Sequence, residues 1–224
     1  MDKPAFTDIF IFVFILSIFV IPPLFVKTVP PAAFSSWTFP VQRLFLAAGA
    51  GILVLYMKNG KNAKPKKPAE RQIGIFINSG YILSTFGTLC VTAALMELLL
   101  HFAGGRSSVI PVRPASAVQL LFCILDFAAA SFFEEVVYRL YLPEIFLKFL
   151  SRIPRFHFAA VCSEAFPVVL FALAHRYLGI PSVVNAALAC IFLRVCCKRT
   201  GTVLTNTTAH FAYNLLSLFL FSAI

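Results

Sequence analysis

Two adjacent glutamates lie in an apolar stretch of the sequence, and an arginine follows: Glu134, Glu135 and Arg139. Neighbouring side chains on an α-helix point about 100° apart, so the two carboxylates cannot share one environment. Glu135 and Arg139 have the spacing and order of a helical ion pair. Glu134 would then project elsewhere, where a poorly solvated carboxylate suits a general base acting on water. The alternative interpretation is a static charge network that locks helices together.

Two later apolar segments carry polar residues at helical spacing. Phe171 and His175 are four residues apart and share a helix face, and His210 and Asn214 have the same spacing. Donors arranged like His210 and Asn214 can stabilise a developing oxyanion. An interhelical hydrogen bond is the alternative for that pair, and a satisfied interfacial histidine is the alternative for His175.

The composition requires these residues to sit in a membrane protein. Of 224 residues, 60% are hydrophobic and only 12% are charged, and the mean hydropathy is +0.89. Soluble domains carry about 25% charged residues, so a soluble enzyme, a disordered tail and a nucleic-acid-binding domain are poor fits. Only Asp2, Asp8 and Glu70 among the nine acids lie in polar or terminal positions. We therefore expect an all-α, polytopic transmembrane helix bundle with an internal polar cavity, as in a transporter, a proton pathway or an intramembrane hydrolase.

Apolar runs of about 20 residues mark the expected spans. The sequence predicts about seven of them, with a short interfacial helix over 139–150. They cover 9–26, 42–57, 73–103, 117–138, 158–175, 181–197 and 202–223. We expect two regions: N-terminal spans with a basic linker over 1–72, and a catalytic membrane core over 73–224 with its motifs within 131–214.

The distribution of positive charge predicts the orientation. The net charge is +10, and most lysines and arginines lie in the predicted loops that share one side of the membrane with the N-terminus. The linker over 58–72 alone holds Lys58, Lys61, Lys64, Lys66, Lys67 and Arg71. Loops rich in lysine and arginine remain cytoplasmic, so we expect the N-terminus inside and the C-terminus outside. Because this positive charge orients the loops of a membrane protein, we expect no nucleic-acid partner.

Together the three motifs resemble a known family. Glu-Glu-x-x-x-Arg, Phe-x-x-x-His and His-x-x-x-Asn follow one another on successive apolar segments, as they do in the CAAX-protease and bacteriocin-processing family (also called Abi). That family includes the type II CAAX prenyl endopeptidases. The resemblance covers roughly 117–223, and the earlier spans match only as generic hydrophobic helices.

The resemblance implies an intramembrane endopeptidase with a role for each motif residue. The implied site consists of the water-activating base Glu134, the water-holding His175, the oxyanion donors His210 and Asn214, and the supporting pair Glu135 and Arg139. Members are often described as metalloproteases, and Glu134, His175 and His210 could ligate zinc. We favour the metal-free mechanism, because the sequence has no His-Glu-x-x-His pair on one helix.

Two other functions stay open at this point. A proton- or ion-coupled transporter would use Glu97, Asp126, Glu134 and Glu164 as relays. A non-catalytic bacteriocin-immunity protein would use the same fold without hydrolysis. For the protease, the expected partners are the lipid bilayer and a peptide or lipidated-peptide substrate. That substrate would be prenylated in a eukaryotic endoplasmic reticulum, or a leader or signalling peptide at a prokaryotic plasma membrane.

Overall fold

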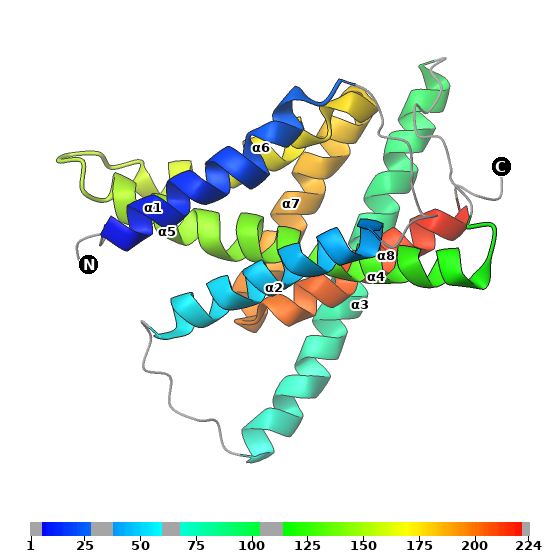
Figure 1. Cartoon of the computed structure of the whole chain (residues 1–224), viewed down its shortest axis with the longest axis horizontal. Coiled ribbons are helices and arrows are strands. Elements are labelled where there is room, and N and C mark those ends of the chain that lie inside the picture. Colours follow the sequence, from blue (N-terminus) through cyan, green and yellow to red (C-terminus); the bar gives the residue numbers. More distant parts are fainter. Residues whose placement is uncertain (1–5, 28–37, 60–67, 104–113, 221–224) are drawn as a thin grey trace. The chain divides into compact units, whose positions relative to one another are not determined.

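The computed structural model describes residues 6–27, 38–59, 68–103 and 114–220, and regular structure in these ranges is helical without a strand (Figure 1). This confirms the all-α class. Part of the predicted basic linker, including Lys61, Lys64, Lys66 and Lys67, lies outside the described residues.

Each of the seven predicted apolar segments is helical in the structure. The first is α1 (Phe6–Ile15), continued by a π-helix η1 (Leu16–Val20) and a 3₁₀-helix η2 (Pro22–Phe25). The other six are α2 (Thr38–Asn59), α3 (Pro68–Phe102), α4 (Ala117–Glu134), α6 (Ala159–Ala174), α7 (Ile180–Thr200) and α8 (Val203–Leu220). The predicted short helix is α5 (Leu142–Leu150), which carries Pro143 in its first turn and follows a π-helix η3 (Glu135–Tyr141).

Three helical stretches in the described ranges are long and apolar enough to cross a membrane. They cover Phe6–Phe25, Asn78–Phe102 and Ile180–Thr200, and two shorter apolar helices cover Val41–Met57 and Ala159–Ala174. A span of the hydrocarbon core needs about 20 such residues. The chain is therefore a helical integral membrane protein.

Local sequence signals set several helix ends. The Ser116 side chain accepts a hydrogen bond from the Gln119 backbone N–H at 3.2 Å and caps the start of α4. Pro22 and Pro23 follow the π-helical end of the first helix, as their missing N–H donors predict. Gly201, with φ of +66°, ends α7 in the left-handed conformation that glycine adopts at low cost.

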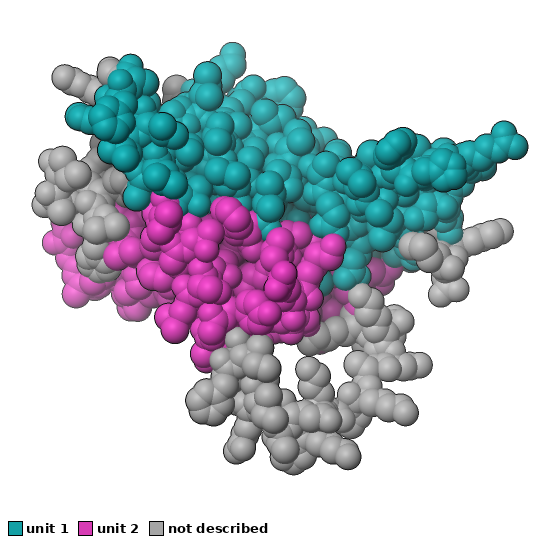
Figure 2. All heavy atoms as spheres, turned by 180° about the vertical axis from the view of Figure 1, so that it is seen from behind, with its two compact units in different colours: residues 1–30, 92–109, 138–191 teal, residues 31–91, 110–137, 192–224 magenta. Residues whose placement is uncertain are grey.

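The chain forms two compact units, coloured separately in Figure 2. Unit 1 comprises residues 1–30, 92–109 and 138–191, and unit 2 comprises residues 31–91, 110–137 and 192–224. In unit 2, helix α4 packs against both α2 and α8, and in unit 1, α5 packs against α6. The predicted division of the chain at residue 72 stays a prediction.

Aromatic rings fill the contacts of α5 in unit 1. The Phe146 ring on α5 stacks on the Phe166 ring of α6, with centroids 4.1 Å apart and planes 12° from parallel. Phe149 meets Phe12 of α1 edge-on at 5.0 Å. These rings fix α5 against both neighbours.

Asp8 corrects one sequence-based expectation. We expected it in a polar or terminal position, but it lies within α1 and is only 7% exposed. Its Oδ2 accepts a hydrogen bond from Lys148 Nζ of α5 at 2.6 Å. A buried carboxylate requires such a partner, and this one is 140 residues away in the sequence.

Candidate active site

The two glutamates of the first motif lie where α4 changes to a π-helix. Glu134 is the last residue of α4, and Glu135 is the first of η3. The Glu134 side chain is 28% exposed and the Glu135 side chain is fully buried. The adjacent carboxylates therefore occupy different environments. Short π-helical stretches inside α-helices frequently lie at functional sites.

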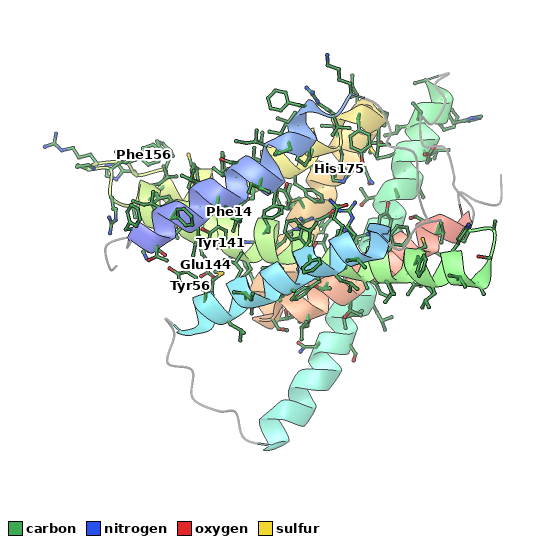
Figure 3. The ribbon with its side chains drawn as sticks, viewed as in Figure 1. Phe14, Tyr56, Tyr141, Glu144, Phe156 and His175 are labelled. Carbon is green, nitrogen blue, oxygen red and sulfur yellow. The ribbon has the colours of Figure 1, made fainter. Side chains whose placement is uncertain are left out.

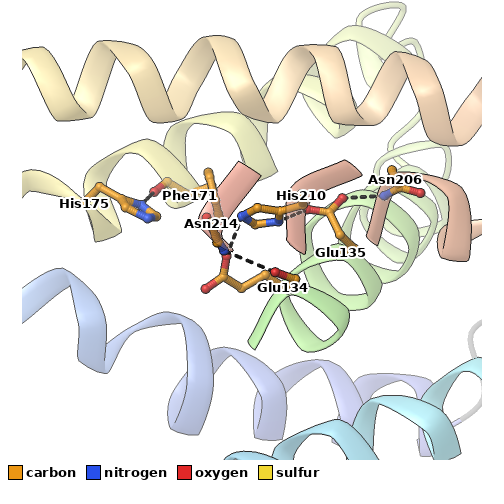
Figure 4. A network of polar contacts seen from close by, with 8 residues as sticks. Glu134, Glu135, Phe171, His175, Asn206, His210 and Asn214 are labelled. Carbon is orange, nitrogen blue, oxygen red and sulfur yellow. Dashed lines mark hydrogen bonds and ion pairs between the residues drawn. The ribbon is translucent and has the colours of Figure 1, made fainter. Parts of the chain in front are cut away.

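Helix α8 supplies the partners of the buried carboxylate. Glu135 Oε1 lies 2.7 Å from His210 Nδ1, and Glu135 Oε2 accepts a hydrogen bond from Asn206 Nδ2 (Figure 4). Both α8 residues are themselves buried. An ionised carboxylate is an acceptor only, so His210 carries a proton on Nδ1 when Glu135 is charged.

The second ring nitrogen of His210 faces the other glutamate. Nε2 lies 3.9 Å from Glu134 Oε2, which is beyond hydrogen-bond range but within ion-pair distance when the ring is protonated. His210 thus lies between a buried carboxylate on one ring edge and a partly exposed carboxylate on the other. This is the arrangement of an imidazole that is both oriented and available for chemistry.

Asn214 extends the same face of α8 by one turn. Its Nδ2 donates to Ser131 Oγ of α4 at 3.2 Å, and Ser131 is fully buried. An amide nitrogen has two N–H donors, so this bond uses one and leaves the other for a further acceptor. Ser131 therefore orients the Asn214 amide.

His175 lies at the C-terminal end of α6, where a side chain can turn back onto the helix (Figure 3). Its Nδ1 is 2.8 Å from the Phe171 carbonyl oxygen, which is one of the last acceptors of that helix (Figure 4). A carbonyl only accepts, so Nδ1 is the donor. In the neutral imidazole Nε2 then keeps a lone pair for a water or another donor.

The Phe171 ring joins Arg139 to His175 within unit 1. The Arg139 guanidinium carbon lies 3.9 Å above the ring centroid, and the His175 ring is 4.6 Å away. Tyr138 meets the same ring edge-on at 5.1 Å. Arg139 is fully buried, and a cation over an aromatic face recovers part of the energy lost on leaving water. The expected ion pair between Glu135 and Arg139 stays a prediction.

Comparison with known families supports the motif pattern. Residues 116–216 match the family model described as type II CAAX prenyl endopeptidase Rce1-like. This part of the chain is similar to the Rce1-like family. Neither a curated protein nor a solved structure gave a significant match. The matched range contains every residue of the three motifs.

The Rce1-like family implies a protease, and the apolar helices place it in a membrane. The structure brings Glu134, Glu135, His210 and Asn214 together between α4 and α8 of unit 2. His175 and Arg139 belong to unit 1, where Phe171 connects them.

Two polar residues of the candidate site were missed as site residues from the sequence. Asn206 bonds Glu135, and Ser131 bonds Asn214. Asn206 could have been found, because residues 206, 210 and 214 repeat every four positions on one helix face. Ser131 gave no comparable signal, since a serine in an apolar helix commonly bonds its own backbone.

A zinc site needs three protein ligands in the usual catalytic arrangement. Among the residues that the structure describes, no group of three His, Cys, Asp or Glu side chains could hold one metal ion. In unit 2, His210 Nε2 and Glu134 Oε2 face each other as two candidate donors, while Glu135 is already bonded to His210 and Asn206. Unit 2 by itself therefore offers two candidate zinc donors, and the metal dependence of the site stays a prediction.

Proposed function

We propose that the protein is an intramembrane endopeptidase that hydrolyses a peptide bond near the membrane. The observation that carries this proposal is the difference in burial and hydrogen bonding between two adjacent carboxylates. Glu135 is buried and bonded to α8, whereas Glu134 is partly exposed and faces His210. That division gives one carboxylate to orient the imidazole and leaves the other for a general base.

In the proposed reaction, Glu134 removes a proton from water as the oxygen attacks the carbonyl carbon of the scissile bond. The resulting tetrahedral oxyanion accepts hydrogen bonds from His210 Nε2–H and Asn214 Nδ2–H. Collapse of the intermediate breaks the C–N bond, and Glu134 returns its proton to the leaving amine. The products are a carboxylate peptide and an amine peptide.

This mechanism requires a particular protonation state of His210. Glu135 holds the Nδ1 proton, so donation from Nε2 requires the imidazolium form. Glu135 Oε1 lies 2.7 Å from His210 Nδ1, so an ionised Glu135 places a negative charge beside the imidazolium ring. The buried glutamate thus supports the oxyanion donor.

His175 is proposed to hold the attacking water. Its Nδ1 is committed to the Phe171 carbonyl, so Nε2 of the neutral ring accepts a hydrogen bond from a water proton. We therefore expect His175 to position the nucleophile, with Glu134 as the base.

The proposed substrate is a membrane-bound peptide. The Rce1-like match favours a carboxyl-terminal Cys-a-a-X peptide carrying a prenyl group, and a leader or signal peptide is the alternative substrate. The Asp8–Lys148 bond supports a shared side for the N-terminus and the loop after α5, which the basic residues predict to be cytoplasmic.

The test uses purified protein in lipid vesicles and three peptides: a prenylated Cys-a-a-X peptide, its unprenylated form and a leader peptide. Cleavage products are identified by mass spectrometry. Glu134→Ala and His175→Ala should abolish turnover while leaving insertion and folding intact. Wild-type cleavage by either variant would refute the assigned roles. Full activity after chelation, with no zinc in the protein, is expected for the metal-free mechanism.

The transporter hypothesis gains no support from Asp126. Its Oδ1 lies 2.9 Å from Arg43 Nε of α2, and the Asp126 side chain is 8% exposed. Arginine keeps its charge at all physiological pH values, so this pair is suited to a fixed contact between helices. Flux measurements across the same vesicles would test the alternative directly.

A further inference from the structure

We propose that Asn206 is a positioning residue that sets the orientation of His210 through Glu135. This role goes beyond the three motifs, none of which includes Asn206. It rests on the proposed function, because its main measurement is peptide cleavage.

The position of Asn206 excludes direct contact with substrate. Its side chain is fully buried, one helical turn before His210 on α8. Its Nδ2 donates to Glu135 Oε2, while His210 Nδ1 binds the other oxygen of the same carboxylate. Asn206 and His210 therefore hold Glu135 by its two oxygens, and the carboxylate cannot rotate without breaking one of these bonds.

The chemistry of the amide fixes which way Asn206 acts. If the amide oxygen of Asn206 faced the carboxylate, two acceptors would lie against each other. The amide nitrogen must therefore face Glu135. The Asn206 Oδ1 atom is buried without a hydrogen-bond partner among the described residues. Burying an acceptor without a hydrogen-bond partner costs free energy of folding. Such a cost is expected where the amide nitrogen of the same side chain serves the site.

Helix α8 offers a matched control in the next residue. Thr207 Oγ1 is also buried and has no hydrogen-bond partner in the described part of the chain. Thr207→Val removes this hydroxyl with little change of shape. Asn206→Leu likewise removes both polar atoms and keeps a side chain of similar size. The two variants therefore differ in that only Asn206→Leu loses the bond to Glu135.

The experiment measures kcat, KM and melting temperature in vesicles for both variants. Asn206→Leu should lower kcat about ten- to hundredfold with KM within about twofold of wild type, because a hydrogen bond to a charged group is lost. Thr207→Val should match the wild type. In a Glu135→Gln background, Asn206→Leu should cause little further loss, because its effect passes through the Glu135 carboxylate.

Three results would overturn the role of Asn206. Wild-type kcat in Asn206→Leu would do so, and so would a fully additive loss in the Glu135→Gln background. Failure of both Asn206→Leu and the milder Asn206→Ser to fold would assign Asn206 to folding alone. If the wild-type protein cleaves no peptide, the proposed function fails first. If it cleaves and Asn206→Leu equals Thr207→Val, only this inference fails.

Discussion

Helix α4 and its π-helical extension carry two acidic regions that differ in the partner each receives. Asp126 pairs with Arg43 of α2, whereas Glu134 and Glu135 meet His210 and its neighbours on α8. Arginine holds its proton permanently, but histidine gains and loses one near neutral pH. The ion pair of the first region is suited to holding two helices together. We propose that the second region also transfers protons, and the same substitution made in both regions tests this difference.

The largest expected effect comes from changing carboxylate to amide in each region. Glu134→Gln should lower kcat by about 10²–10⁴-fold, because the amide cannot accept a proton from water. Asp126→Asn should leave kcat per folded molecule within about threefold of wild type. Peptide cleavage in vesicles measures both. Equal losses of kcat in the two variants would show that the two regions do not differ in function.

The next largest effect on kcat is expected at the hydrogen-bond donors of α8, which have no counterpart beside Asp126. His210→Gln and Asn214→Ala should each lower kcat by about 10²–10³-fold, the usual loss of one oxyanion donor. KM should change little, since these bonds strengthen only as negative charge develops. A rise in KM with unchanged kcat would instead assign both residues to substrate binding.

The aromatic contact of His175 should give an intermediate effect. Phe171→Leu keeps the backbone carbonyl that His175 uses but removes the ring between Arg139 and His175, and kcat should fall about tenfold. Phe146→Leu is the matched control, because Phe146 stacks on Phe166 elsewhere in unit 1. It should lower the melting temperature without lowering kcat. The reverse pattern would contradict a positioning role for Phe171.

A change in stability without a change in chemistry is expected at Arg43. The Arg43 side chain is 41% exposed, which weakens the pair, so Arg43→Met should cost about 1–2 kcal/mol by leaving Asp126 buried without that cation. Combining it with Asp126→Leu should recover most of the loss. Thermal unfolding measures the cost, and a lower kcat per folded molecule would show that the pair serves catalysis.

The smallest expected effect is at Ser131. Ser131→Ala removes the 3.2 Å bond to Asn214 and should lower kcat about threefold, since a neutral hydrogen bond contributes roughly 0.5–1.5 kcal/mol. A loss as large as that of Asn214→Ala would mean that Ser131 itself contacts the reacting atoms.

The helices and much of the site could be predicted from local pattern. Long apolar runs gave the seven segments, and the four-residue spacing placed His210 and Asn214 on one face. The π-helix after Glu134 could not be predicted, because hydropathy does not distinguish i→i+5 from i→i+4 bonding. The ring partner of Arg139 and the cation beside Asp8 depend on distant segments, which spacing along one helix does not report.

The bond between Asp8 and Lys148 has a consequence for synthesis in the cell. The two residues are 140 positions apart, so the first helix reaches the membrane long before its cation exists. At about 5–20 residues per second, the delay is roughly 7–30 s. During that time the Asp8 carboxyl must stay at the interface, bind a proton or use a temporary partner. The final pairing of the Asp8 carboxylate with Lys148 can therefore form only when α5 has been made.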